Sequence, residues 1–404
     1  MSLNQDQIDI LADKYIISLY KNLERDVIGD IVRRVKKCER WTETAEIEAK
    51  HLRELGYSPK EIQAKVLQML RADKEFQDFI AQNTLEHKKY VMDCIRQTER
   101  DAKKAGDKMV AEAGNMSFND DLSMWEEAGK DLSKPNNMTQ MVNAFQKQTN
   151  QELRNLTRTM GFKGTTLENV STAFQKELDQ CVVKVASGSF SFDAALKDCI
   201  RTLSKSGLRT IDYASGRTYQ IDTASRMCVR TCISQLSGRI TEANIESTGV
   251  DLVITSQHVG ARPEHEVWEN QVFSYDGKSK KYPDFVSSTG YGEPDGLKGV
   301  NCTHEFYPYW EGISVIPDKK VEPDPVEVDG KTYTYYEATQ KQRQMERSIR
   351  ADKRERDALN SIGEDSSEVR NRISKKINDY HRFSQYGSSA LYHWPALHQT
   401  ELWQ

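Results

Sequence analysis

QHVGARPEHEVWENQVFS (257–274) and STGYGEPDGLKGVNCTHEFYPYW (288–310) carry the densest run of Gly, Pro, His and aromatic residues in the chain. Each glycine that becomes ordered costs conformational entropy. A stretch so rich in turn formers therefore keeps one shape only where short strands and loops fix one another. We predict a compact, loop-rich α+β domain over residues 250–317, which the rest of the chain serves as a scaffold.

Short strands and one short helix are expected inside this compact domain. Residues 252–255, 271–274 and 304–310 have the apolar or alternating patterns of strands. Pro263 has a backbone angle suited to the first turn of a helix, so it is well placed to start one.

The sequence before residue 260 has a different character, with two of the ten prolines of the chain. Apolar residues recur every three or four positions between residues 6 and 38, which predicts one long helix with a single apolar face. That stripe includes Leu11, Tyr15, Leu19, Leu23, Val27 and Ile31.

Further helices are predicted throughout the first 250 residues. A helix that Gly56 can close is followed by a second one, which starts at the capping box Ser58-Pro59-Lys60-Glu61. A second capping box, Thr165-Thr166-Leu167-Glu168, is expected to start another helix, and a hairpin is expected across Ala214-Ser215-Gly216. The other predicted helices cover 74–112, 138–159 and 222–245.

After Pro317 the chain becomes charged and linker-like. Asp329-Gly330 suits a hairpin turn, helices are predicted over 337–356 and 366–383, and a tail follows from residue 384 to residue 404. The fold class is therefore a mainly α scaffold of long helices, a small α+β domain and a helical C-terminal extension. The expected regions are 1–134, 135–249, 250–317 and 318–404.

Composition limits the kind of protein. The 404 residues are 37% hydrophobic and 29% charged, with a net charge of -4, which gives no overall attraction to nucleic acid or anionic membranes. Seven cysteines without a close framework argue against a disulfide-built secreted protein. The N-terminus lacks the pattern of a signal peptide, and no apolar stretch approaches the length of a membrane span. We expect a soluble protein made in a reducing compartment.

The strongest chemical signal is the set His258, His265, Cys302 and His304. Imidazole and thiolate are preferred zinc ligands, and four of them would close a tetrahedral structural site. The spacing is not that of a common zinc finger, so buried, hydrogen-bonded histidines beside a buried cysteine are the alternative. A Cys302–His304 catalytic pair is a further alternative, although no third orienting group is evident. Cys228 and Cys232, one helical turn apart, are expected to pack in a core.

A row of arginines marks the predicted helix over 337–356. Their spacing of three to four places them on one face, where they could contact DNA phosphates. The interspersed acidic residues favour an ordinary solvated face instead. The row consists of Arg343, Arg347, Arg350 and Arg354.

Several stretches carry a resemblance to a known family. LYKNLERDVIGDIVRRVKK (19–37), HLRELGYSPKEI (51–62), GRTYQIDTASRMCVRTCISQLSGR (216–239) and the two stretches quoted first are similar to the phage minor capsid protein 2 family. The element Asn301-Cys302-x-His304 also resembles the Asn-Cys-x-Cys end of MuF-type minor head proteins. If that pair binds metal in relatives, His304 could serve in place of the second cysteine.

The resemblance implies a non-enzymatic virion component inside the head at the portal vertex, made in the host cytoplasm, that acts in head assembly and in DNA packaging or delivery. It implies the portal protein as partner, with major capsid or scaffolding protein and packaged DNA as further candidates. Residues 1–134 would then dock on the portal through the apolar stripe of the first helix. No cofactor is implied apart from a structural zinc. The alternative is a metal-dependent hydrolase or nuclease that uses His258, His265 and His304.

Overall fold

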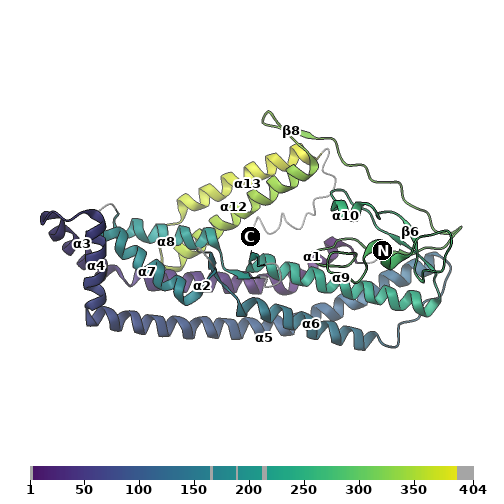
Figure 1. Cartoon of the computed structure of the whole chain (residues 1–404), viewed down its shortest axis with the longest axis horizontal. Helices are drawn as coiled ribbons and strands as arrows, with labels where there is room; N and C mark the ends of the chain where they lie inside the picture. Colours follow the sequence, from purple (N-terminus) through teal and green to yellow (C-terminus); the bar gives the residue numbers. More distant parts are fainter. Residues whose placement is uncertain (1–2, 164–166, 188–189, 212–215, 389–404) are drawn as a thin grey trace.

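The computed structural model describes residues 3–163, 167–187, 190–211 and 216–388 and shows an elongated molecule of long helices (Figure 1). The helices α3 (Glu39–Glu54) and α4 (Pro59–Ala72) lie at one end, and the strand β6 (Val272–Ser274) lies at the other. Between them the 54-residue helix α5 (Lys74–Glu127) runs along one side. The predicted mainly α architecture is confirmed. No helix among the described residues is long and apolar enough to cross a membrane.

The N-terminal helix is almost continuous, as predicted. It consists of α1 (Gln5–Ala12), one π-helical turn (Asp13–Ile17) and α2 (Ser18–Lys36). The capping box at Ser58 is also confirmed. The Ser58 side chain accepts from the Glu61 backbone N–H, and the Glu61 carboxylate accepts from the Ser58 backbone N–H. Gly56 ends the preceding helix with a φ of 85°, a conformation that favours glycine.

Several helix boundaries differ from the sequence-based prediction, including the ends of the last two helices, at Ser361 and Ser388 instead of residues 356 and 383. The helix expected to end near residue 112 continues to Glu127, because no proline interrupts it and its apolar positions keep their helical spacing. The helix expected to start from a Thr165 capping box begins instead at Val170, and Asn169 caps it. Leu167–Asn169 forms a strand, and residues 165 and 166 lie outside the described residues.

The remaining elements up to residue 250 complete the scaffold. The expected hairpin is present as the antiparallel pair of β3 (Arg209–Ile211) and β4 (Thr218–Gln220), although residues 212–215 lie outside the described part of the chain. The sheet order is β2-β1-β3-β4. These elements are α6 (Met138–Arg158), β1 (Gly161–Lys163), β2 (Leu167–Asn169), α7 (Val170–Ala186), α8 (Phe192–Ser206), β3 (Arg209–Ile211), β4 (Thr218–Gln220) and α9 (Ile221–Thr248).

One apolar core joins all the long helices. Helix α2 lies inside the bundle and contacts α5, α7, α8, α9 and the C-terminal helix α12 (Tyr335–Ser361). Leu23, Val27 and Ile31 on α2 are each at most 1% exposed. Burial of such side chains stabilises a fold by about 1.5–3 kcal/mol each. Residues of both predicted helical regions, 1–134 and 135–249, contribute to this core.

A second core forms the compact domain at the far end. The three antiparallel strands β5 (Leu252–Thr255), β6 and β7 (Phe306–Pro308) pair in the order β6-β5-β7, and short helices α10 (Pro263–Glu266) and α11 (Phe285–Thr289) flank them. The predicted strands and the Pro263 helix are confirmed. Trp125 from α5 enters this core, where its ring meets that of Trp310 edge to face at 5.3 Å. The domain is therefore packed onto the ends of α5 and α9.

The C-terminal extension returns along the scaffold. The hairpin of β8 (Val326–Val328) and β9 (Lys331–Tyr333) turns at Asp329 and Gly330, whose φ angles of 52° and 76° fit the predicted two-residue turn. Helices α12 and α13 (Ser367–Ser388) then pack together, and α12 also contacts α2 and α8. The predicted tail over residues 384–404 is partly wrong, because residues 384–388 continue α13, and residues 389–404 lie outside the described residues.

One buried carboxyl group next to the compact domain makes stability depend on pH. Asp121 on α5 is fully buried and accepts hydrogen bonds from Asn244 at 2.8 Å and Thr241 at 3.2 Å. Burial raises the pKa of Asp121 to about 7, well above its ordinary value of about 3.9. The folded state therefore holds this proton more tightly than the unfolded state does, and stability falls as pH rises from about 4 to 7.

Asp121→Asn is expected to remove this pH dependence, because asparagine stays neutral and has nearly the same shape. Between about pH 5 and pH 8, the wild type should lose about 2–3 kcal/mol more stability than the variant. Urea denaturation at the two pH values, followed by far-UV circular dichroism, measures the difference. Equal losses in both proteins would show that Asp121 is charged throughout this range.

Candidate metal centre

The structure brings three of the four predicted metal ligands together. His265 lies in α10, and Cys302 and His304 lie in the segment that leads into β7. The Nδ1 atoms of the two imidazoles are 3.4 Å apart. The Cys302 Sγ is 3.9 Å from His265 Nδ1 and 3.7 Å from His304 Nδ1. All three side chains are buried, so the cluster is part of the interior of the compact domain.

A hydrogen-bond partner also holds the Nε2 atom of each imidazole, on the side away from the cluster. The Nε2 of His265 donates to the backbone carbonyl of Asp295 at 2.8 Å. The Nε2 of His304 lies 2.7 Å from Oε1 of Glu269, which accepts the backbone N–H of His258 as well. Outer hydrogen bonds of this kind orient histidine ligands in metal sites.

The fourth predicted ligand, His258, lies beside the cluster. It forms a second potential group with Glu269 and His304. Its Nε2 is 2.6 Å from the hydroxyl of Thr303, and its ring is 4.1 Å from the ring of His304. In the described structure the predicted set of four is therefore split, with His304 common to both groups.

Burial sets the protonation of the cluster. Burial, together with the neighbouring imidazoles of His258 and His265, lowers the pKa of His304 to about 2. Burial also raises the pKa of the Cys302 thiol. A nucleophilic cysteine needs a stabilised thiolate, so this environment does not favour a catalytic Cys302–His304 pair.

Two contributors were not identified from the sequence. Glu269 orients His304, and the ring of Trp268 lies 4.8 Å from that of His265 and 4.6 Å from that of His304. Glu269 follows His265 by four positions, which is a weak signal. Glu269 can orient His304 only because the fold brings residues 302–304 next to the loop that carries Glu269.

The apolar stripe predicted to bind a partner lies mostly inside the molecule. Four of its members are at most 2% exposed, and the other two pack partly buried against the same core. In this conformation the helices α5, α7, α8, α9 and α12 cover α2, so the stripe does not present a free apolar surface. The four buried residues are Leu11, Leu23, Val27 and Ile31, and the two partly buried ones are Tyr15 and Leu19.

The arginine row on α12 is divided between solvent and core. Arg343 and Arg347 are exposed, and Arg350 is half-buried with its Nε 3.9 Å from a carboxylate oxygen of Asp222. Arg354 is only 8% exposed and pairs with Glu24 on α2, so in this conformation its guanidinium lies neither on a solvated face nor where DNA could contact it. The four arginines do not form one exposed face, because Arg354 points into the scaffold.

A comparison of the sequence with protein families identifies the chain. The model described as Phage minor capsid protein 2 matches residues 3–383. The chain belongs to this family. The resemblance seen in the sequence is thereby confirmed, and this minor capsid protein 2 chain is a phage structural protein.

Two phage proteins called structural protein are similar to this minor capsid protein 2 chain. One, from Lactococcus phage LL-H, is 27% identical over 289 residues, which cover 68% of this chain and 74% of that protein. The other, from Lactococcus phage mv4, is 36% identical over 90 residues, which cover 22% of this chain and 68% of that protein. No solved structure matches.

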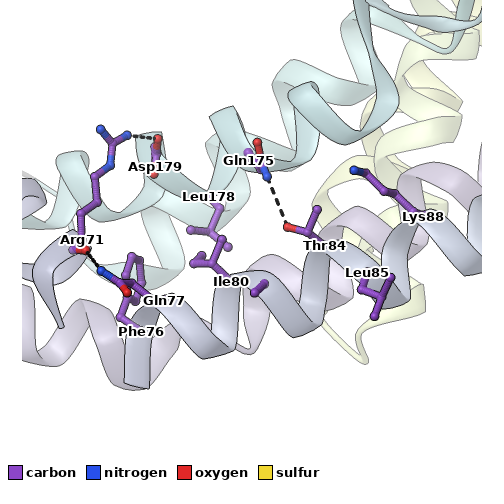
Figure 2. Close-up of a pocket in the computed structure, with 11 residues that line it drawn as sticks. Arg71, Phe76, Gln77, Ile80, Thr84, Leu85, Lys88, Gln175, Leu178 and Asp179 are labelled. Atoms are coloured by element: carbon purple, nitrogen blue, oxygen red, sulfur yellow. Dashed lines mark hydrogen bonds and ion pairs between the residues drawn. The ribbon is translucent and has the colours of Figure 1, made fainter. Parts of the chain in front are cut away.

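A groove lies at the opposite end of this chain from the histidine–cysteine cluster. Figure 2 shows its walls, which come from the end of α4, the start of α5 and one face of α7. It encloses about 500 Å³, with Phe76, Ile80 and Leu178 as apolar lining. The ion pair between Arg71 and Asp179, at 2.6 Å, spans it.

Proposed function

We propose that this chain is a minor structural protein of the phage head that binds the portal from inside the capsid and acts in head assembly and in DNA packaging or delivery. The family match over residues 3–383 carries the proposal. The name structural protein for both phage relatives supports it.

The shape of the molecule fits a bridging role. Helix α5 alone, with 54 residues, spans about 80 Å at 1.5 Å per residue. The compact domain sits at one end of this rod and the α3–α4 helical pair at the other (Figure 1). A rod with different surfaces at its two ends can contact one partner at the portal while its other end reaches into the head.

The α3–α4 end has surface features that suit a protein partner. Ile47 is 73% exposed, Leu55 is 60% exposed and Leu85, on the adjacent part of α5, is 71% exposed. Leu85 also lines the groove of Figure 2. Ile47 lies on α3, and Leu55 caps the C-terminal end of that helix. Exposed apolar residues at the same end of a molecule as a groove are typical of protein interaction sites. We assign the portal contact to this end.

Co-purification with the portal protein of the same phage tests the assignment. Wild type should bind the assembled portal, and the double variant Leu55→Glu, Leu85→Glu should weaken binding at least tenfold, because buried carboxylates oppose an apolar contact. Both residues are exposed, so the fold should be retained, which circular dichroism checks.

Val267→Glu is the matched control. Val267 is 69% exposed in the compact domain at the far end, and its substitution should leave portal binding unchanged. Loss of binding in the control alone would move the contact to the compact domain. Wild-type chain that never co-purifies with the portal would refute portal association itself.

A further inference from the structure

The hydrogen bonds around the histidine–cysteine cluster decide where its protons lie. The carbonyl oxygen of Asp295 can only accept, so the Nε2 of His265 carries the hydrogen and its Nδ1 carries a lone pair. Oε1 of Glu269 already accepts the backbone N–H of His258, so the Nε2 of His304 is also the donor. Both Nδ1 atoms therefore present lone pairs to each other at 3.4 Å.

A single thiol proton does not satisfy this arrangement. The S–H group of Cys302 can donate to one Nδ1 only, and at 3.7 or 3.9 Å such a bond is weak. Within the part of the chain that the structure describes, no other N–H or O–H group donates to the remaining nitrogen, and such a buried lone pair is costly in a protein interior. A cation at the centre of the three atoms would satisfy all of them at once.

The separations match a tetrahedral zinc site. With Zn–N bonds of about 2.0–2.1 Å and Zn–S bonds of about 2.3 Å, tetrahedral geometry places two nitrogens about 3.3 Å apart and a nitrogen and sulfur about 3.6 Å apart. The observed separations are 3.4, 3.7 and 3.9 Å. Two imidazoles and one thiolate also form a donor set that binds Zn²⁺ in preference to Mg²⁺ or Ca²⁺.

We propose that His265 Nδ1, Cys302 Sγ and His304 Nδ1 bind one Zn²⁺ ion, with a water molecule in the fourth position. No fourth His, Cys, Asp or Glu ligand atom among the described residues lies within 4.8 Å of all three, and this favours water. Binding releases the thiol proton of Cys302 to solvent, so the affinity should fall at low pH. The proposal stands independently of the portal assignment.

The ion would act as a structural cross-link. His265 and Cys302 are 37 positions apart, so zinc would tie α10 to the segment before β7. The compact domain has strands of only three or four residues and a small core, and small domains commonly need such a staple. The outer bonds from Asp295 and Glu269 would hold the ligands in place.

Elemental analysis of the full-length chain, purified without chelators under reducing conditions and dialysed against zinc, tests the site. The wild type should hold about one zinc per chain, and Cys302→Ser and His265→Ala should hold almost none. Cobalt offered to metal-free wild type should produce the visible absorption of a tetrahedral site, with a sulfur-to-cobalt charge-transfer band. This reading on the unaltered chain remains valid if a ligand variant fails to fold.

Three further variants separate ligation from general damage to the fold. Cys232→Ser, at a buried cysteine in α9, should retain the zinc. Glu269→Ala should weaken zinc binding about tenfold to a hundredfold, whereas Glu269→Gln, which keeps an acceptor oxygen, should restore most of it. His258→Ala should keep both the zinc and the cobalt spectrum.

Three results would contradict this set of zinc ligands. Wild type that binds neither zinc nor cobalt, or zinc that persists in Cys302→Ser, would overturn the site. Loss of zinc in His258→Ala would show that His258, and not water, is the fourth ligand. None of these results depends on whether the chain binds a portal.

Discussion

Asp30→Ala is expected to destabilise the scaffold by about 3–5 kcal/mol. Asp30 on α2 is 5% exposed, and its Oδ2 lies 2.8 Å from Nε of Arg34 and 2.6 Å from Nδ1 of His87 on α5. Burial alone would raise the pKa of Asp30, but these two hydrogen bonds outweigh it and lower the pKa. Removing the carboxylate leaves the fully buried imidazole of His87 without its acceptor. It also leaves the buried guanidinium of Arg34 with Glu86, at 2.9 Å, as its remaining charge partner.

Urea denaturation followed by far-UV circular dichroism measures this effect. Asp26→Ala is the control, because Asp26 lies on the same helix and its ion pair among the described residues is with the neighbouring, exposed Arg25. That substitution should change stability by no more than about 0.5 kcal/mol. Comparable effects of the two substitutions would mean that the buried network contributes nothing beyond a surface charge.

Arg354→Ala is expected to have an effect of similar size, about 3–5 kcal/mol, because it leaves a buried carboxylate unpaired. Arg354 on α12 donates from Nε to the carbonyl of Ser204 on α8 at 2.8 Å, and its Nη1 lies 3.4 Å from Glu24 on α2. Glu24 is 4% exposed and also accepts the backbone N–H of Leu208 at 2.7 Å. This arginine therefore ties the C-terminal extension to the scaffold.

Hydrogen exchange resolved along the chain, together with urea denaturation, distinguishes this role from a DNA contact. Arg354→Ala should speed exchange in α12 and α13, which lose their anchor to α2 and α8. Arg347→Ala, an exposed arginine of the same helix, should leave exchange and stability unchanged. If Arg354→Ala behaves like Arg347→Ala, the buried pair does not hold the extension in place.

Much of the local structure followed from the sequence. The Ser58 capping box, the Asp329-Gly330 turn and the three strands of the compact domain depend on neighbouring residues, whose backbone preferences are readable from residue type. The family could also be recognised from the sequence, and the match over residues 3–383 confirms it. The start of α7 was misplaced because Leu167–Asn169 pairs with β1, a contact that helix capping patterns do not encode.

The partners of individual side chains were not predictable in the same way. The stripe of Leu23, Val27 and Ile31 has the same spacing whether it faces another protein or the chain's own helices, and the structure buries it against the latter. Periodicity shows that a face is apolar, but long-range packing decides what covers it.

Most of the helices, the turns and the residues able to bind a metal could be predicted from the sequence, because these depend on local backbone preference and on the chemistry of each side chain. The long-range fold was needed to show that His265, Cys302 and His304 meet while His258 lies beside them, and that Arg354 is buried. Those outcomes require residues dozens or hundreds of positions apart to come into contact, and the free energy of packing, which no short pattern contains, selects which of them do.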